Sequence, residues 1–461
     1  MWESSAYIQD DWRAKPWLTL NLGLRYDVFT PFTEAHDRIS NLDTVHAKIL
    51  VAGQDGVSKT AGIRTDYSNV APRVGFAAML GHGLVVRGGY GITFFPTNYT
   101  SVFELKNPPF TSSYGPVSPQ LLSAGFPPPT PTDPDNPYGT IRAQALDYRS
   151  AYLQQFSLTL EKDFEGNVLR LGYVGQLGRH LALFFPNINI ASPSPLPDPR
   201  SRAPFAQSLP NASSISFAQS TGTSSYHALQ VAFERRYNAG LAVSSNYTWA
   251  HQTDDVSSLG SYSPGYGVLP SAVAEVERGN ADLDIRHRFV VAANYEIPFG
   301  KSLKGSRRWL LQGWQINGIV VYQTGLPFSI VNAYPLSNTG VDLYQSDRPN
   351  RVKDGKLPNP TLNQYFDTTA FEPQPFGTLG NSGRNILYGP SFKTVAISLF
   401  KQFDLKDSWR LQFRTECYNI TNTPSFGAPN SLLGYSNFGS ISTMNANYTP
   451  RQFQFALKLL F

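Results

Sequence analysis

A few short motifs contain residue types that catalytic and nucleotide-binding sites use, but each lacks an essential member. Gly300-Lys301-Ser302 has the end of a Walker A phosphate-binding sequence, but Tyr295 stands where the first glycine belongs. Gly89 and Gly91 begin a dinucleotide-type pattern in which Phe94 replaces the third glycine. Neither a Gly-x-Ser-x-Gly nor a His-Glu-x-x-His sequence occurs. These motifs predict turn and strand glycines, no catalytic residues and no enzyme.

Residues that bind metals are present without the spacing of a metal site. No two of the seven histidines have the spacing of a ligand pair on one local element: His36, His46, His82, His180, His227, His251 and His287. Asp254 and Asp255 could bind Ca²⁺ together, but their place in an expected loop favours a solvated charge pair. We expect no metal and no cofactor.

The composition excludes several classes of protein. Of the 461 residues, 15% are charged and 13% aromatic, against about 25% charged in a typical soluble domain. The net charge of +5 comes without a long basic cluster, so no nucleic-acid partner is expected. The single cysteine, Cys417, excludes a disulfide framework. No apolar run approaches the roughly 20 residues that a transmembrane helix needs.

The elements that position these residues are predicted to be β-strands. From Leu18 to Val28, apolar side chains alternate strictly with Thr19, Asn21, Gly23 and other small or polar residues. This period of two indicates a strand with one apolar and one polar face. The same pattern predicts thirteen strands, at 4–14, 18–29, 71–80, 84–95, 150–164, 168–176, 225–237, 241–251, 286–297, 314–324, 393–403, 409–418 and 450–461.

The connections between these strands alternate between short and long. The short ones lie at 15–17, 81–83, 165–167, 238–240 and 405–408, with 299–313 as one longer exception. The long ones lie at about 30–70, 96–149, 177–224, 252–285, 325–392 and 419–449. This alternation is typical of an antiparallel transmembrane β-barrel of the outer membrane, with short periplasmic turns and long extracellular loops.

Aromatic residues lie near the predicted strand ends, as in the interfacial girdles of such barrels. Examples are Trp12, Trp17, Trp249, Trp409 and Phe461. In the alternative interpretation they fill the core of a soluble β-sandwich, but a sandwich needs turn signals every 8–12 residues or so. The fold class is therefore all-β.

The direction of the strands predicts an incomplete barrel. The first strand ends in a short turn and the last strand ends the chain, so both run towards the periplasm and their number is odd. Bacterial single-chain barrels have even strand numbers. Thirteen strands would leave two edges in lipid, where each unpaired backbone group costs several kcal/mol.

At five places the sequence resembles a TonB-dependent outer-membrane receptor of the Oar-like subgroup. The stretches are YIQDDWR (7–13) with LTLNLGLRYD (18–27), APRVGFA (71–77) with VRGGYG (86–91), RGN (278–280) with DIRHRF (284–289), GW (313–314) with QTGLPF (323–328), and RTE (414–416) with NITNTP (419–424). The chain also ends like an outer-membrane assembly signal, formed by Gln454, Ala456, Leu459 and Phe461.

This resemblance implies a barrel of 22 strands with a plugged lumen. Residues 1–461 would then be its C-terminal portion of about 13 strands, with nine strands, the plug domain, the TonB box and the signal peptide absent. The implied partners are outer-membrane lipid, the barrel assembly machinery, an unknown large substrate and, through the missing N-terminal part only, TonB. The resemblance implies uptake, or export, of a substrate bound by the extracellular loops.

Two groups of side chains are candidates for function in such a barrel. Those expected to face the lumen are Arg25, Glu234, Arg236, Arg410, Arg414 and Glu416. Aromatics in the long loops that could stack on a sugar or peptide are Tyr99, Tyr114, Tyr138, Tyr334, Tyr344 and Tyr365.

Two other functions remain open. A passive outer-membrane channel or surface adhesin without a plug would form a folded assembly from this chain alone. A soluble β-rich carbohydrate-binding or hydrolytic protein would fold in water without detergent and keep its activity when Phe461 is removed.

Overall fold

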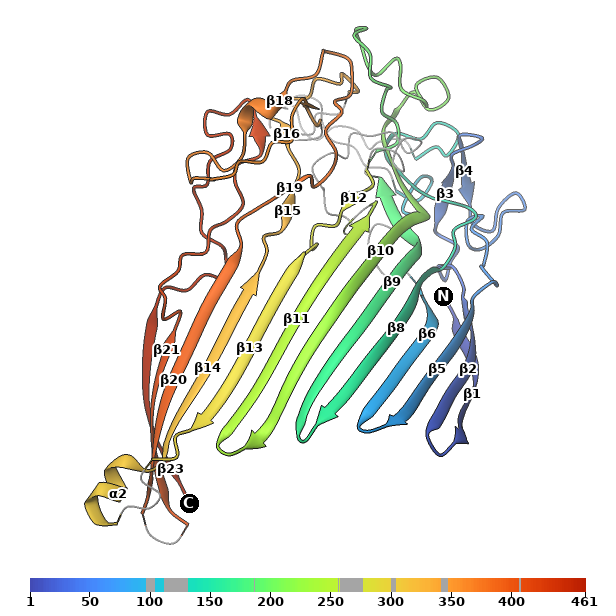
Figure 1. Cartoon of the computed structure of the whole chain (residues 1–461). Coiled ribbons are helices and arrows are strands. Elements are labelled where there is room, and N and C mark those ends of the chain that lie inside the picture. Colours follow the sequence, from blue (N-terminus) through green and yellow to red (C-terminus); the bar gives the residue numbers. More distant parts are fainter. Residues whose placement is uncertain are drawn as a thin grey trace.

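The computed structural model is dominated by one large, curved antiparallel sheet (Figure 1). The structure describes residues 1–96, 104–111, 132–185, 187–255, 257, 277–299, 304–340, 347–405 and 408–461. Within these residues, no helix is long and apolar enough to cross a membrane.

Thirteen strands follow one another in space in the order of the sequence, which confirms the predicted all-β fold. They are β1 (Glu3–Lys15), β2 (Leu18–Phe29), β5 (Val70–Gly81), β6 (Leu84–Phe95), β8 (Ala151–Phe164), β9 (Asn167–Phe185), β10 (Ala212–Asn238), β11 (Leu241–Asp254), β13 (His287–Glu296), β14 (Trp314–Gln323), β20 (Phe392–Asp404), β21 (Arg410–Tyr418) and β23 (Gln452–Leu460). Their ends agree closely with the prediction, apart from those of β9 and β10.

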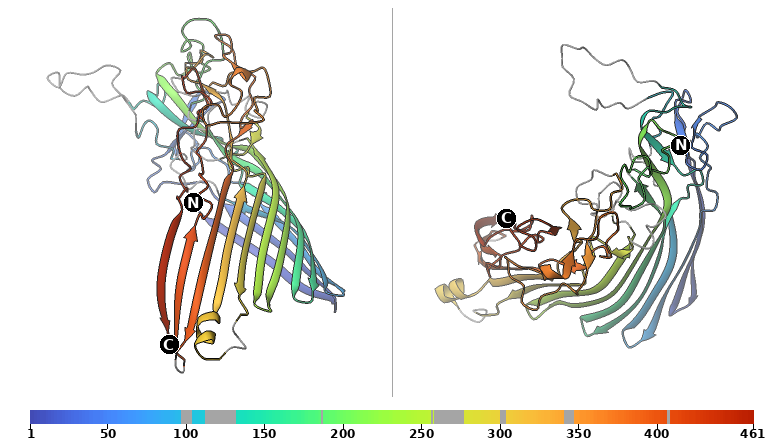
Figure 2. Two further views of the ribbon diagram at one scale, coloured as in Figure 1. Left: turned by 60° about the vertical axis from the view of Figure 1, so that its left-hand side comes forward. Right: turned by 90° about the horizontal axis from the view of Figure 1, so that it is seen from above.

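The sheet is curved into an open trough whose two edges are β1 and β23 (Figure 2). Every neighbouring pair along this path is antiparallel, so the two edge strands run in the same direction. Two-residue turns such as Pro16-Trp17 and Ala239-Gly240 join the strands at one end, which we call the short-turn end. The long connections gather at the opposite, long-loop end (Figure 1).

The alternation of the sequence gives the wall two different faces. On β2, Leu22 and Leu24 point to the convex face and remain 42% and 48% exposed. The ring of Phe413 on β21 stacks on that of Phe455 on β23, with 6.5 Å between centroids. An exposed apolar surface of this extent suits contact with lipid, because the wall is a single layer with no second sheet to cover it.

The strands β9 and β10 continue well beyond their predicted ends at 176 and 225. Both ends of the expected loop 177–224 therefore belong to a long hairpin, and β10 also pairs in parallel with β7 (Gly139–Gln144). The added segment has little apolar alternation. Above a membrane a strand has no lipid on either side, so the period-two signal that predicted the other strands is lost there.

The long loops contain further short elements and the buried cores of the protein. These elements are β3 (Ser40–Asp43), β4 (Lys48–Val51), β12 (Gly279–Asn280), β15 (Pro327–Phe328), β16 (Val331–Asn332), β17 (Asn350–Arg351), β18 (Phe371–Glu372), β19 (Leu387–Tyr388), β22 (Leu432–Leu433) and the 3-10 helix η4 (Thr368–Ala370). One core surrounds Ile141 and Ile215, and another surrounds Ile330 and Phe366. The loops are thus packed structures in their own right.

The longer connection at the short-turn end contains a helix, α2 (Gly305–Leu311). It lies between β13 and β14 and projects beyond the wall (Figures 1 and 2). The length of this connection was predicted as an exception, but its helix was not.

Candidate functional site

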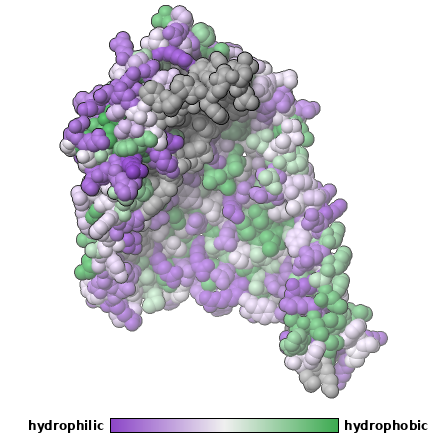
Figure 3. All heavy atoms as spheres, turned by 180° about the vertical axis from the view of Figure 1, so that it is seen from behind, coloured by the Kyte–Doolittle hydropathy of each residue, from purple (hydrophilic) through white to green (hydrophobic). Residues whose placement is uncertain are grey.

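The hollowed face of the sheet carries a row of charged side chains across four neighbouring strands. Glu161 on β8 lies 3.6 Å from Arg87 on β6 and 2.8 Å from Arg170 on β9. Arg170 lies 3.2 Å from Glu234 on β10. The register places Glu161 opposite Arg170, so all these side chains point to one face. Figure 3 shows this face, where hydrophilic residues gather within the hollow.

The other residues expected to face the lumen lie on further strands of the wall, and their lumen-facing orientation stays a prediction. Arg25 donates to Asp27 with an Nε–Oδ1 distance of 2.8 Å. Arg414 donates to Gln412 at 2.7 Å, and its guanidinium lies 4.7 Å from the centre of the Phe400 ring.

Glu416, Arg410 and Arg236 complete the predicted set. Glu416 accepts a hydrogen bond from Tyr418 at 3.0 Å. Arg410 and Arg236 are exposed near the short-turn end. The six residues are distributed along the wall and do not form one cluster.

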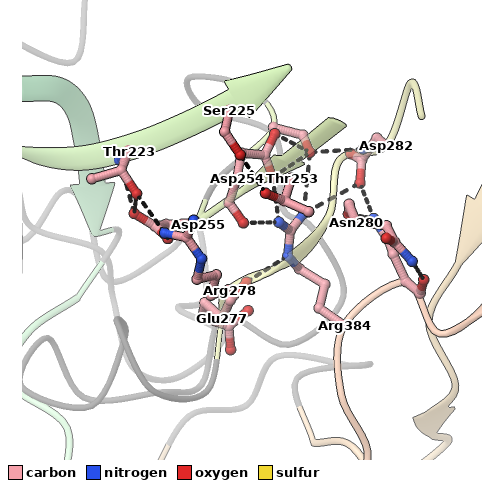
Figure 4. Close-up of polar contacts among 12 residues, drawn as sticks. Thr223, Ser225, Thr253, Asp254, Asp255, Glu277, Arg278, Asn280, Asp282 and Arg384 are labelled. Atoms are coloured by element: carbon pink, nitrogen blue, oxygen red, sulfur yellow. Dashed lines mark hydrogen bonds and ion pairs between the residues drawn. The ribbon is translucent and has the colours of Figure 1, made fainter. Parts of the chain in front are cut away.

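A second polar site lies at the long-loop end and is buried (Figure 4). Its centre is Arg384, whose side chain is 1% exposed. The guanidinium pairs with the Asp254 carboxylate and donates to the backbone oxygen of Glu277 at 2.8 Å. It also donates to Ser257 Oγ at 3.1 Å and lies 3.6 Å from the Asp282 carboxylate.

A second buried arginine holds the same segment. Arg348 donates to both carboxylate oxygens of Glu277, at 3.0 and 2.9 Å. The two side chains are 4% and 6% exposed. A bidentate pair of this kind fixes the orientation of both partners as well as their separation. The loop after β14 is therefore joined to the segment before β12 by two arginines.

Hydrogen bonds of Asn385 extend this contact to the rim of the wall. Its side chain donates to the backbone oxygen of Asn280 at 2.8 Å and to Asp282 at 2.7 Å. Its backbone N–H donates to Ser329 Oγ at 2.9 Å.

Tyr388 adds a further polar contact beside β13. Its hydroxyl donates to Asp284 at 2.5 Å and accepts from Arg286 Nε at 2.9 Å. Burial, together with the hydrogen bond to Asp284, raises the pKa of Tyr388 to about 12. The hydroxyl therefore stays protonated and acts as a donor at physiological pH.

The prediction of a solvated pair at Asp254 and Asp255 is wrong. Asp254 and Asp255 are 4% and 7% exposed. Asp255 accepts from the backbone N–H and the hydroxyl of Thr223, at 2.8 and 2.7 Å. Asp254 pairs with Arg384, and Asp255 accepts hydrogen bonds from Thr223, so both carboxylates are bound within the protein. In the described parts of the chain, no three potential metal ligands lie together.

The candidate loop aromatics do not form one surface in the parts that the structure describes. Tyr334 is 64% exposed. Tyr365 packs against the core around Phe366, and burial raises its pKa. Tyr138 lies in a cleft of about 530 Å³ beside the start of β10. The remaining three, Tyr99, Tyr114 and Tyr344, lie outside the described residues.

The four residues of the expected assembly signal lie on or directly after β23. Gln454 pairs with Glu416, and Ala456 with Arg414, on the polar side of the register. Leu459 lies opposite Leu411. The ring of Phe461 is 87% exposed and lies 5.5 Å from that of Trp409.

The roles of Arg384, Arg348 and Glu277 were not predicted from the sequence. Arginines and glutamates in polar loops normally indicate solvated side chains. The one available signal was the RGN and DIRHRF stretches, which contain Asn280, Asp284 and Arg286.

A family model agrees with this architecture. This model, described as an outer membrane beta barrel domain, matches residues 1–454. A search of curated proteins finds no match. Among solved structures, the outer membrane transporter YddB from Escherichia coli aligns with 100% of this chain at 10% identity and a TM-score of 0.49.

Two further solved structures are similar. The ferric enterobactin receptor PfeA from Pseudomonas aeruginosa aligns with 100% of this chain at 11% identity and a TM-score of 0.49. The siderophore receptor PiuA from Acinetobacter baumannii aligns with 99% at 12% identity and a TM-score of 0.45. The chain spans less than half of each, namely 45% of YddB, 45% of PfeA and 42% of PiuA. Since the family model matches nearly the whole sequence, the chain belongs to the outer membrane β-barrel domain family, and its location is the outer membrane.

Proposed function

We propose that residues 1–461 form the C-terminal part of the barrel of a TonB-dependent receptor of the Oar-like subgroup. This receptor binds a large substrate with its extracellular loops and moves it through the lumen. The observation that carries the proposal is the common direction of β1 and β23, the two edges of a thirteen-strand sheet. Antiparallel closure requires an odd number of additional strands, and nine of them give the 22 of such transporters.

The two polar sites support a receptor wall. The charges of Glu161 and its neighbours lie on the hollowed face, where a polar lining is needed for passage or for contact with a plug. The buried arginines hold the loop after β14 over the extracellular end. A loop that must present a binding surface benefits from such fixed anchoring.

The partners in this proposal follow from the parts of the molecule. Lipid contacts the convex face, the barrel assembly machinery recognises β23 and its terminal Phe461, and TonB acts through an upstream segment. Glu161, Arg384 and the other polar residues line and hold the passage and perform no catalysis.

The proposal is tested on the complete reading frame around the Met1 codon. We expect an upstream segment with nine strands, a plug and a signal peptide, and we expect the complete protein to co-purify with the periplasmic domain of TonB. A stop codon directly upstream, together with steady conductance by the 461-residue chain in planar bilayers, would instead establish a passive channel.

A further inference from the structure

The connection between β13 and β14 differs from the other short-turn connections because it folds back on the outside of the wall. In β20, Ile397 and Leu399 are 38% and 37% exposed on the convex face. Side chains alternate along a strand, so Lys401 and Phe403 belong to the same face. The ring of Trp309, from α2, lies 4.4 Å from that of Phe403. The helix α2 therefore packs on the lipid side of the wall, as Figure 2 shows from above.

Lys401 fastens α2 to this face. Its Nζ donates to the backbone oxygen of Trp309 at 2.9 Å, to that of Gln402 at 3.2 Å, and to that of Gln312. The ammonium group also lies 4.5 Å from the centre of the Phe403 ring. The residue is 3% exposed, and it forms no ion pair with a carboxylate in the described part of the chain. Its positive charge is thus solvated by backbone dipoles, and the Asp404 carboxylate attracts it without forming an ion pair.

The free surface of α2 combines basic and apolar side chains. Trp309, Leu310 and Leu311 are 57%, 60% and 44% exposed. Arg307 and Arg308 precede them and are also exposed, and the helix has no acidic residue in its first turn. Exposed tryptophan and leucine beside arginine are typical of a helix lying in a membrane interface.

A hollow of about 400 Å³ lies between α2 and the wall. Arg308, Trp314 and Lys401 line it, and so do the carboxylates of Glu296 and Asp404. Glu296 accepts a hydrogen bond from Tyr237 at 2.5 Å, and Asp404 accepts one from Gln402 at 3.1 Å. Both acids therefore have partners of their own. On the α2 side, Arg308 donates its Nε–H to Gln312 Oε1 at 2.5 Å, and its two terminal NH₂ groups form no hydrogen bond within the described residues.

We propose that α2 and this hollow bind the phosphate headgroup of an anionic phospholipid in the periplasmic leaflet of the outer membrane. Arg307 and Arg308 contact the headgroup, while Trp309, Leu310 and Leu311 enter the boundary with the acyl chains. Lys401 is the positioning residue that holds α2 at this depth. The inference requires the outer-membrane location only, so it stands or falls independently of substrate uptake.

The test uses the protein reconstituted in bilayers with brominated phosphatidylglycerol or brominated phosphatidylcholine. The Trp309 signal is the difference in fluorescence between the protein and its W309F variant. We expect bromine to quench this signal, with phosphatidylglycerol binding at least about fivefold more strongly than phosphatidylcholine, since each arginine contact contributes about 1 kcal/mol.

The matched variants are R307Q/R308Q and R13Q/K15Q. The second pair removes two basic residues beside the β1–β2 connection, which is also at the short-turn end but is a two-residue turn without a helix. We expect the lipid preference to disappear in R307Q/R308Q and to persist in R13Q/K15Q. Absence of Trp309 quenching, equal quenching by both lipids in the unmodified protein, or an unchanged preference in R307Q/R308Q would overturn the proposal.

Discussion

Arg384 and Asp254 form a buried ion pair although 130 residues separate them in the sequence. Asp254 is the last residue of β11, and Arg384 belongs to the long loop between β14 and β20. The side chain of Arg384 is 1% exposed and that of Asp254 is 5% exposed. The pair therefore fastens an extracellular loop to the end of a wall strand at a point that water does not reach.

Replacement of Arg384 by alanine should release this loop. The change leaves the Asp254 carboxylate buried without its cation, and breaking a buried pair in this way costs about 3–5 kcal/mol. We expect the free energy of local opening to fall by this amount, measured by hydrogen exchange of the backbone amides around residues 384–388.

Arg351→Ala is the matched control in the same loop. Arg351 pairs with Asp354 at 2.6 Å, but these side chains are 31% and 63% exposed. An exposed pair contributes at most about 1 kcal/mol. Equal effects of the two substitutions would mean that burial of Arg384 does not hold the loop.

The strands of the wall were predictable from the sequence, whereas the contact between Arg384 and Asp254 was not. Lipid on one side and water on the other impose a period of two, which is why strands such as β2 and β20 were found at nearly their observed ends. The pair Arg384 and Asp254 leaves no such trace, because partners so far apart are brought together only by the folded loops. The helix α2 is too short for a periodic signal.

A second prediction concerns Gly175, which lies directly opposite Phe156 on the neighbouring strand. The Phe156 ring lies over the position that a Cβ at residue 175 would occupy. Gly175→Ala should displace this ring and cost about 1–3 kcal/mol, as overpacking does. The measurement is urea unfolding of the protein in detergent.

Gly318→Ala provides the control for this substitution. Gly318 is also on the convex face of a wall strand, but a Cβ there would meet only the Ala396 oxygen at 3.9 Å. Alanine at this position should be neutral or slightly stabilising, because it loses less backbone entropy on folding than glycine. A cost at Gly318 equal to that at Gly175 would rule out the ring contact as the cause.

Phe461→Ala should impair assembly with little effect on the stability of molecules that do assemble. The Phe461 ring is 87% exposed, and truncation of such a surface residue changes stability by less than about 0.5 kcal/mol. We expect less protein in the outer-membrane fraction, measured by immunoblot, with an unchanged unfolding midpoint. Phe376→Ala, at a loop phenylalanine that is 56% exposed, should leave the level unaltered; normal levels of both variants would refute an assembly signal.

The last prediction concerns the pH dependence of Asp66, at the extracellular end of β5. Its carboxylate accepts from the N–H and hydroxyl of Ser68, at 2.9 and 2.6 Å, and from the Ser150 N–H at 3.1 Å. Partial burial opposes its ionisation, but these hydrogen bonds outweigh burial and hold the pKa of Asp66 below its ordinary value of 3.8.

A lowered pKa in the folded state stabilises the protein above the unfolded pKa, and this stabilisation is lost as the pH falls through the folded value. Asp66→Asn removes the charge at every pH. The difference in unfolding midpoint between the unmodified protein and D66N should therefore be largest near pH 6 and should shrink below pH 3.8. A difference that stays constant across this range would show that Asp66 acts through its shape and neutral hydrogen bonding alone, since other carboxylates titrate equally in both proteins.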